Sequence, residues 1–194
     1  MTRIEYILKH APHVIRALTR TRLFPSIMIA QALLESADKY GTPGNSLLAA
    51  KFNNHFGIKA DVSWVGQKVG LSTNEFVAGA MTKVKAWFRV YQHAFQSFDD
   101  RIQFLIANPR YKSGGVFKAL DAGEQAMALQ RSGYATDPGY ASKLMKLIYK
   151  FNLEKLDHLT DSKLDLSDYL FQKPISQFNR PLNEQNDTNE QNNK

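Results

Sequence analysis

The sequence predicts a mainly α-helical α+β domain with a small β-hairpin lobe inserted among the helices. Two observations support this fold class. Apolar residues recur at helical spacing along most of the chain, and one central segment, residues 81–91, alternates apolar and polar side chains with the period of a strand. The length of 194 residues, 43% of them hydrophobic, suits one compact domain.

The N-terminal third predicts three helices. Thr2 and Glu5 have the spacing of a capping box, so we expect the first helix to begin almost at the N-terminus. Pro12 cannot donate a backbone hydrogen bond, and we expect it to separate this helix from a second one. Pro25 suits the first turn of a third helix, which we expect to run to about Tyr40.

The central segment predicts the β lobe, at about residues 55–91. Residues 81–91 alternate as a strand, and residues 67–73 form a second extended segment. Turn residues Ala78 and Gly79 lie between the two. We therefore expect an antiparallel hairpin.

Capping residues predict three later helices. The pairs are Ser97 with Asp100 for a helix that ends before Pro109, Asp121 with Glu124 for a helix to about Arg131, and Asp137 with Pro138 for a final core helix. We assign residues 1–160 to the domain and 161–181 to a C-terminal extension whose packing the sequence does not define. Residues 182–194 are polar and of low complexity, and we expect them to be disordered.

Composition and charge argue against some classes of function and leave others open. The net charge of +7 is compatible with an anionic partner such as nucleic acid, a membrane surface or a wall polymer. Lys and Arg are scattered along the helices without a recognition motif, which argues against nucleic acid. With no cysteine, the chain has no disulfide or thiol nucleophile. His55 and His93 lack metal-ligand spacing, so we expect no metal and no other cofactor.

Glu35 is the first candidate for chemistry. On a helical wheel it lies beside Gln31 and Met28, at the flank of an apolar stripe. A carboxyl group partly removed from water has a raised pKa and can act as a general acid near neutral pH. The wheel alone leaves open the alternative that Glu35 points into solvent.

Glu75 is the candidate for a second carboxylate, which cleavage of a glycosidic bond usually requires. It lies in the β lobe, on a separate element that could face the Glu35 helix. The alternative is an ordinary polar turn residue, and Asp61 is a weaker candidate in the same lobe.

Several motifs occur together in one order: PSIMIAQALLES, LLAAKFNNHFGIK, the STNEF segment, WFRVY, DDRIQFL with ANPRY, and SGYATDPGYASKL. With them the chain resembles the glucosaminidase domain of glycoside hydrolase family 73, which includes autolysins and the wall-cutting domain of the flagellar rod protein. The resemblance covers roughly Ile4 to Leu153.

The resemblance implies a lysozyme-like fold and an endo-β-N-acetylglucosaminidase, cleaving the β-1,4 bond between N-acetylglucosamine and N-acetylmuramic acid in peptidoglycan. Glu35 matches the family's general acid and Glu75 its second carboxylate. In relatives a tyrosine matching Tyr134 lies close to the acid. The residues that we expect to contact substrate are Tyr134, Tyr140, Asn54, Phe56, Trp64, Arg89, Tyr91 and Gln31.

The sequence is also compatible with other functions. A lytic transglycosylase or a muramidase could use the same fold, and a non-catalytic module could bind the wall. The N-terminal segment lacks an uninterrupted apolar core, and no stretch is long enough to span a bilayer, so we expect no ordinary export signal and no membrane insertion. We expect a monomer that reaches the wall through phage lysis, a phage particle or a secretion system.

Overall fold

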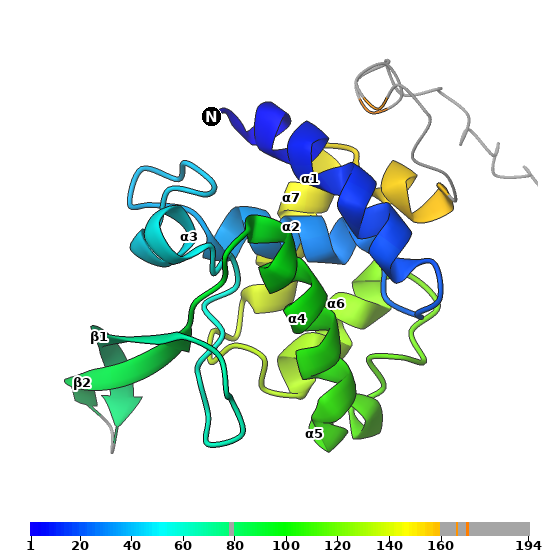
Figure 1. The fold of residues 1–194 in the computed structure, drawn as a ribbon. Helices are drawn as coiled ribbons and strands as arrows, with labels where there is room; N and C mark the ends of the chain where they lie inside the picture. The colour runs from blue at the N-terminus through cyan, green and yellow to red at the C-terminus, as the bar shows by residue number, and fades with distance from the viewer. Residues whose placement is uncertain (78–79, 160–165, 167–169, 171–194) are drawn as a thin grey trace, which may run out of the picture.

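A computed structural model describes residues 1–77, 80–159, 166 and 170, with the backbone alone at 74–77, 80 and 81. The elements, in chain order, are α1 Arg3–Leu18, α2 Pro25–Glu35, α3 Leu47–Phe52, β1 Lys68–Val77, β2 Ala80–Arg89, α4 Ala94–Ala107, α5 Pro109–Ser113, α6 Ala122–Arg131, α7 Tyr140–Lys150 and the 3-10 helix η1 Leu153–His158. Helices form the body, and the β1–β2 hairpin projects from one side of it (Figure 1). This is the predicted α+β fold.

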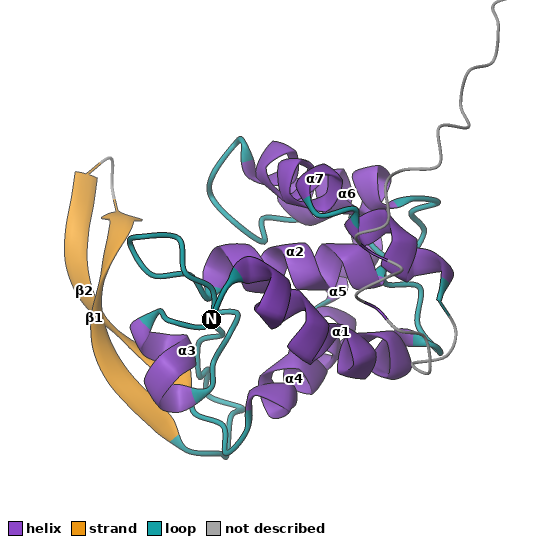
Figure 2. Ribbon diagram, turned by 90° about the horizontal axis from the view of Figure 1, so that it is seen from above, coloured by secondary structure: helices purple, strands orange, loops and turns teal. Residues whose placement is uncertain are grey.

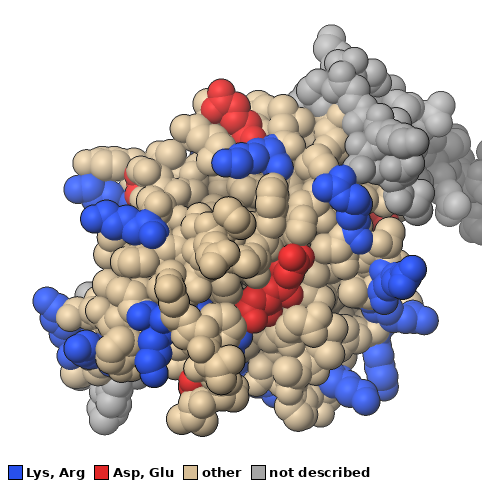
Figure 3. Space-filling model, viewed as in Figure 1, with Lys and Arg blue, Asp and Glu red and all other residues tan. Residues whose placement is uncertain are grey.

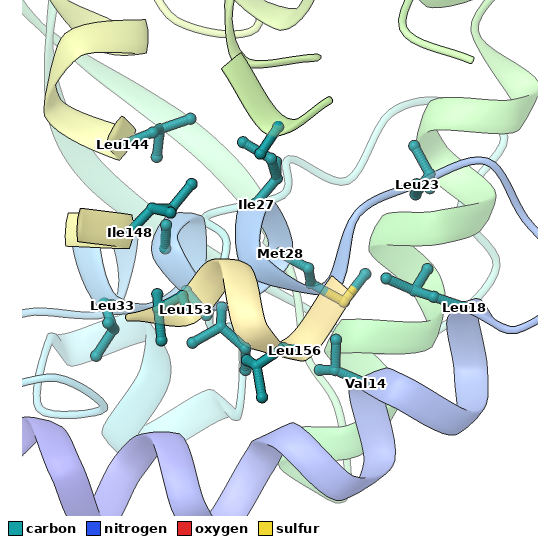
Figure 4. Packing of buried hydrophobic residues seen from close by; sticks show 14 of the residues in the cluster. Val14, Leu18, Leu23, Ile27, Met28, Leu33, Leu144, Ile148, Leu153 and Leu156 are labelled. Atoms are coloured by element: carbon teal, nitrogen blue, oxygen red, sulfur yellow. The ribbon is translucent and has the colours of Figure 1, made fainter. Parts of the chain in front are cut away.

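Helix α2 is the central element of the body. Its residues from Ser26 to Leu33 are all buried, as expected for a helix that is apolar on most of its faces. Figure 2 shows α2 between a layer containing α1 and α4 and a layer containing α6 and α7. In Figure 4 its Ile27 and Met28 lie among apolar side chains contributed by the surrounding helices. This packing fixes the position of Glu35, the last residue of α2.

Helix α1 confirms its predicted start and corrects its predicted end. Thr2 and Glu5 form the capping box, with the Glu5 N–H donating to the Thr2 hydroxyl at 3.2 Å. The helix then continues through Pro12 to Leu18, so the predicted break is wrong. Val14 and Ile15 are fully or almost fully buried on the same face as the first turns, and that packing outweighs the loss of one backbone hydrogen bond at Pro12.

Helix α2 ends five residues earlier than expected, at Glu35 rather than near Tyr40. Ser36 makes the last helical backbone bond, to Ala32, and its hydroxyl accepts the N–H of Gly44 at 2.8 Å. Asp38 then accepts the N–H groups of Tyr40 and Thr42 at 2.9 and 3.0 Å. The side chains of Ser36 and Asp38 accept hydrogen bonds from backbone N–H groups that are not in a helix. The chain therefore turns away directly after Glu35.

The hairpin confirms the strand prediction. Strands β1 and β2 are antiparallel, with Lys68 opposite Arg89 and Gly70 opposite Trp87. The turn predicted at residues 78–79 lies outside the described residues. A bridge between Lys59 and Phe88 extends the pairing at the base of the hairpin.

Helix α4 begins earlier than the pattern indicated. Its N-cap is His93, whose N–H donates to the Gln96 side chain at 3.3 Å, so the predicted Ser97–Asp100 cap is wrong. Ser97 is buried, and its hydroxyl donates to the Ala94 carbonyl. Asp100 lies within the helix, so its carboxylate is available to side chains of other elements.

The later helices follow their predicted caps more closely. Asp121 caps α6 by accepting the Glu124 N–H at 2.8 Å. Asp137 accepts the Gly139 N–H at 2.8 Å, which makes a turn just before α7 instead of its N-cap.

Two residues of the proposed C-terminal extension, Leu166 and Leu170, are buried in the core. Asn152 donates to the Leu170 carbonyl at 3.2 Å. The residues expected to be disordered, 182–194, lie outside the described part. Across the described residues, no helix has both the length and the apolar character needed to cross a membrane.

Candidate active site

The carboxyl group of Glu35 is half-buried at the C-terminal end of α2. Its Oε1 atom accepts a hydrogen bond from the Tyr140 hydroxyl at 3.1 Å. Burial raises the pKa of Glu35, and the Tyr140 hydrogen bond opposes that rise. The negative end of the α2 dipole also disfavours the ionised form. The group therefore combines partial exposure with a tendency to hold a proton.

Two tyrosines lie beside this carboxyl group. Tyr140, the first residue of α7, is 2% exposed. Tyr134 lies in the loop before α7, is partly exposed, and stacks on Tyr140 with ring centroids 5.7 Å apart. The hydrogen bond to the acid therefore comes from Tyr140, while Tyr134 forms the adjacent aromatic surface.

Gln31 links Tyr140 to the interior. It lies one helical turn before Glu35 and is fully buried. Its Nε2 donates to the Tyr140 oxygen at 2.8 Å, and its Oε1 accepts a hydrogen bond from Arg101. Gln31 was expected to contact substrate, but both ends of its amide are occupied inside the protein.

Arg101 was not among the predicted site residues, although a signal for it exists in the sequence. It follows Phe98 by three residues and precedes Leu105 by four, so it falls on the apolar face of α4. All three side chains are fully buried. A charge on an apolar stripe is the same signal that identified Glu35.

Arg89 and Tyr91 lie at the base of the hairpin. Arg89 Nη1 donates to both carboxylate oxygens of Asp100 at 2.9 Å, and Tyr91 donates to the same carboxylate at 2.6 Å. Arg89 also pairs with Asp61 at 3.2 Å. Asp100 therefore braces the hairpin against α4, Asp61 joins Arg89 to the segment before β1, and both carboxylates are committed to Arg89.

Trp64 is partly exposed beside this cluster. Its indole N–H donates to the Gln67 carbonyl at 2.9 Å, and the Arg89 guanidinium lies 4.5 Å from its ring centroid. The Tyr91 ring packs against it in a T-shaped arrangement, with the ring centroids 5.9 Å apart. The position of the indole is thus fixed from several sides.

Asn54 and Phe56 were expected to contact substrate but face the interior. Asn54 is 1% exposed, and its Nδ2 donates to the carbonyls of Ile58 and Arg89 at 2.9 Å each. Phe56 is buried against Phe98. Both residues join the loop after α3 to the hairpin and α4.

Glu75 pairs with Thr82 in the hairpin backbone, and its side chain lies outside the described part. Among the described residues, no group of three or more His, Asp or Glu side chains is placed to hold a metal. Lys and Arg side chains are spread around the edge of the face shown in Figure 3.

Comparison with known proteins places the chain in a family. Residues 11–153 match the family model Glucosaminidase, described as mannosyl-glycoprotein endo-beta-N-acetylglucosaminidase. The chain is 41% identical over 143 residues to the exo-glucosaminidase LytG of Bacillus subtilis, a match covering 72% of this chain and 48% of LytG. It is 38% identical over 144 residues to the peptidoglycan hydrolase FlgJ of Salmonella typhimurium, covering 72% of this chain and 44% of FlgJ.

A solved structure supports the same assignment. The catalytic domain of the autolysin Auto from Listeria monocytogenes superposes with a TM-score of 0.68 at 31% identity, covering 80% of this chain and 87% of that one. The chain spans about half the length of the two curated relatives. By sequence and by its mainly helical, lysozyme-like fold, the chain belongs to the glucosaminidase family, glycoside hydrolase family 73.

Proposed function

We propose that this chain is a peptidoglycan hydrolase that cleaves the β-1,4 bond after N-acetylglucosamine, with Glu35 as its general acid. The observation that carries the proposal is the state of Glu35: a half-buried carboxyl group whose pKa is raised by burial and which the Tyr140 hydroxyl contacts. Family membership supplies the reaction class, since LytG is named an exo-glucosaminidase and FlgJ a peptidoglycan hydrolase.

In the proposed reaction, protonated Glu35 gives its proton to the glycosidic oxygen as the bond from that oxygen to the anomeric carbon breaks, and water supplies the hydroxyl group that this carbon gains. The resulting carboxylate then accepts the Tyr140 hydrogen bond, which favours the ionised form. Tyr134 offers an aromatic face next to the acid on which a sugar ring could stack. Trp64, partly exposed beside the hairpin base, is proposed to border the same glycan path, whereas Tyr91 was expected to contact substrate but is buried next to it.

We further propose Glu75 as the second carboxylate. Its place on β1, a separate element from α2, is compatible with two carboxylates that flank one glycosidic bond. Asp61 and Asp100 are weaker candidates for this role because Arg89 pairs with both.

The experiment compares the full chain with Glu35→Gln on purified peptidoglycan. We expect Glu35→Gln to lower the release of reducing ends by about 100-fold or more, because general acid catalysis contributes that much. Glu154→Gln is the matched control, since Glu154 is exposed on η1. It should retain wild-type activity.

Thermal unfolding shows whether each variant is folded. Activity retained by folded Glu35→Gln would remove Glu35 from the role of acid. Mass spectrometry of the products identifies the bond that is cut. Reducing N-acetylglucosamine ends support the proposal, whereas reducing muramic acid ends indicate a muramidase and anhydro-muramyl ends a lytic transglycosylase. The sizes of the products distinguish internal from terminal cleavage.

A folded wild-type protein that sediments with cell walls and releases no ends would support a non-catalytic wall-binding module instead. The proposed substrate places the site of action at the bacterial cell wall.

A further inference from the structure

Arg101 is a buried cation that donates to Gln31, one helical turn before the candidate acid. It is 0% exposed, and among the described residues no carboxylate forms an ion pair with it. Tyr134, Tyr140 and Tyr111 lie near its guanidinium. Burying an arginine without a carboxylate partner destabilises the folded state, because the charge loses hydration that no counter-ion replaces. A side chain retained at such a cost calls for a role beyond filling space.

The hydrogen bonds around Arg101 have a fixed direction. A guanidinium can only donate, so its partner on Gln31 must be the amide oxygen, Oε1. The amide nitrogen of Gln31 is then directed at the Tyr140 oxygen, 2.8 Å away. Because that oxygen accepts from Gln31, the single hydroxyl hydrogen of Tyr140 is left to donate to Glu35, 3.1 Å away.

We propose that Arg101 and Gln31 are positioning residues that direct the Tyr140 hydroxyl hydrogen at Glu35. The inference rests on the proposed role of Glu35 as the acid. When the O–H bond of Glu35 breaks and its proton forms a new O–H bond with the leaving sugar, the negative charge stays on the Glu35 carboxylate. The Tyr140 hydroxyl is then already oriented to stabilise that charge, without reorientation during the reaction.

This arrangement sets the balance between two opposing influences on Glu35. Burial favours the protonated form, and the Tyr140 donor favours the ionised form. We call the hydrogen-bonded series Arg101, Gln31 and Tyr140 the relay. Breaking the relay at Arg101 or Gln31 should weaken the hydrogen bond from Tyr140 and raise the pKa of Glu35. The competing explanations are that Arg101 only fills space, or that its charge acts directly on Glu35.

The test uses three variants, each made with Tyr140 and with Tyr140→Phe. Gln31→Met breaks the relay while leaving the Arg101 charge in place. Arg101→Met removes charge and donor, and Arg101→Lys retains both. The first readout is an NMR titration of the Glu35 carboxyl carbon in the full chain, assigned with Glu35→Gln. The second is the ratio of hydrolysis rates at pH 8 and pH 6.

With Tyr140 present, we expect Gln31→Met and Arg101→Met to raise the Glu35 pKa by about half a unit, which raises the rate ratio by up to about threefold. Arg101→Lys should stay nearer to wild type. In the Tyr140→Phe background neither Met substitution should raise the pKa of Glu35 further, because the relay acts through the hydroxyl that this background lacks.

Additive shifts in the Tyr140→Phe background would overturn the proposal and favour a direct effect of charge. Unchanged titration in Gln31→Met would overturn it as well, and this variant decides the matter if Arg101→Met does not fold. The NMR titration needs no turnover. An inactive wild-type protein with the expected shifts would therefore refute the proposed function while supporting the relay.

Discussion

The Tyr140 hydroxyl donates to Oε1 of Glu35 at 3.1 Å, between side chains 105 residues apart in the sequence. The bond joins the last residue of α2 to the first residue of α7. Contacts between these helices, and between α6 and α7, hold the two side chains in register. The geometry of the acid therefore depends on how α7 packs.

The first prediction concerns Tyr140→Phe. The variant keeps the ring that stacks on Tyr134 but loses the hydroxyl donor, so the ionised form of Glu35 loses a stabilising partner. We expect the pKa of Glu35 to rise, the basic limb of the pH–rate profile to move to higher pH, and activity at the optimum to fall about tenfold.

Tyr149→Phe is the matched control because Tyr149 lies on the same helix and is exposed. It should leave both the profile and the rate unchanged. A Tyr140→Phe profile that coincides with that of wild type would show that the hydroxyl does not act on the acid.

The sequence predicted the elements well where local chemistry decides the structure. The Thr2–Glu5 capping box and the alternating hairpin strands follow from neighbouring residues alone. The predicted break at Pro12 was wrong because the residues that follow are buried, a tertiary effect, and α1 therefore continues beyond Pro12. Asp100 misled because its spacing from Ser97 resembles a cap, while its actual partner is Arg89, across the boundary between α4 and the hairpin.

The candidate site was only partly predictable for the same reason. The pattern placed Glu35 at the flank of an apolar stripe, and the carboxyl is half-buried. Nothing in a linear spacing shows that Gln31 turns inward to Arg101 and Tyr140, since those partners lie on other helices. The motif residue Asn54 likewise holds a loop together through bonds to backbone atoms.

The second prediction concerns Asn54. Its Nδ2 donates to two carbonyls, and its Oδ1 accepts the Ile58 N–H at 3.0 Å. Asn54→Asp places a buried carboxylate against two carbonyl oxygens, so we expect it to lower the free energy of unfolding by about 3 kcal/mol or more. Asn54→Ala removes the bonds without adding repulsion and should cost less, about 2 kcal/mol.

Denaturant unfolding at pH 7 measures both values. Equal losses in the two variants would mean that repulsion at the carbonyls is relieved by local rearrangement, contrary to this account of the loop.

The third prediction concerns acid sensitivity. Burial lowers the pKa of His10 to about 3 and that of His55 to about 4, from an ordinary value of 6.5. The unfolded chain therefore binds more protons below pH 6.5, and the stability due to the neutral histidines is lost as the pH falls toward 4. Each histidine can contribute up to about 1.4 kcal/mol per pH unit in that window.

His10→Phe tests this directly. His10 is 1% exposed, stacks on Phe98, and neither of its ring nitrogens has a hydrogen-bond partner among the described residues. The variant should match or exceed wild-type stability at pH 7 and lose less stability between pH 6.5 and 4. Parallel pH dependences in the two proteins would exclude His10 as a source of the acid sensitivity.

The fourth prediction concerns Asp157, at the N-terminal end of α2. Its carboxylate accepts the Ser26 N–H at 2.7 Å and the Ser26 hydroxyl at 2.6 Å, so it caps the central helix from η1. Burial raises its pKa to about 6 from an ordinary 3.8. The folded state therefore holds the proton more tightly than the unfolded state, and ionisation costs stability as the pH rises from about 3.8 to 6.

Two substitutions separate the cap from the charge. Asp157→Asn keeps an acceptor for the Ser26 N–H and removes the buried charge, so we expect it to stabilise the protein at pH 8 by about 1 to 3 kcal/mol. Asp157→Ala also removes the charge but leaves that N–H without its partner, so it should be less stable than Asp157→Asn by about 1 to 2 kcal/mol. The gain of the Asn variant over wild type, measured by denaturant unfolding, should shrink toward zero below pH 4, where Asp157 is neutral in both states. An Asp157→Asn variant less stable than wild type at pH 8 would mean that the ionised cap contributes more at this helix end than its burial costs.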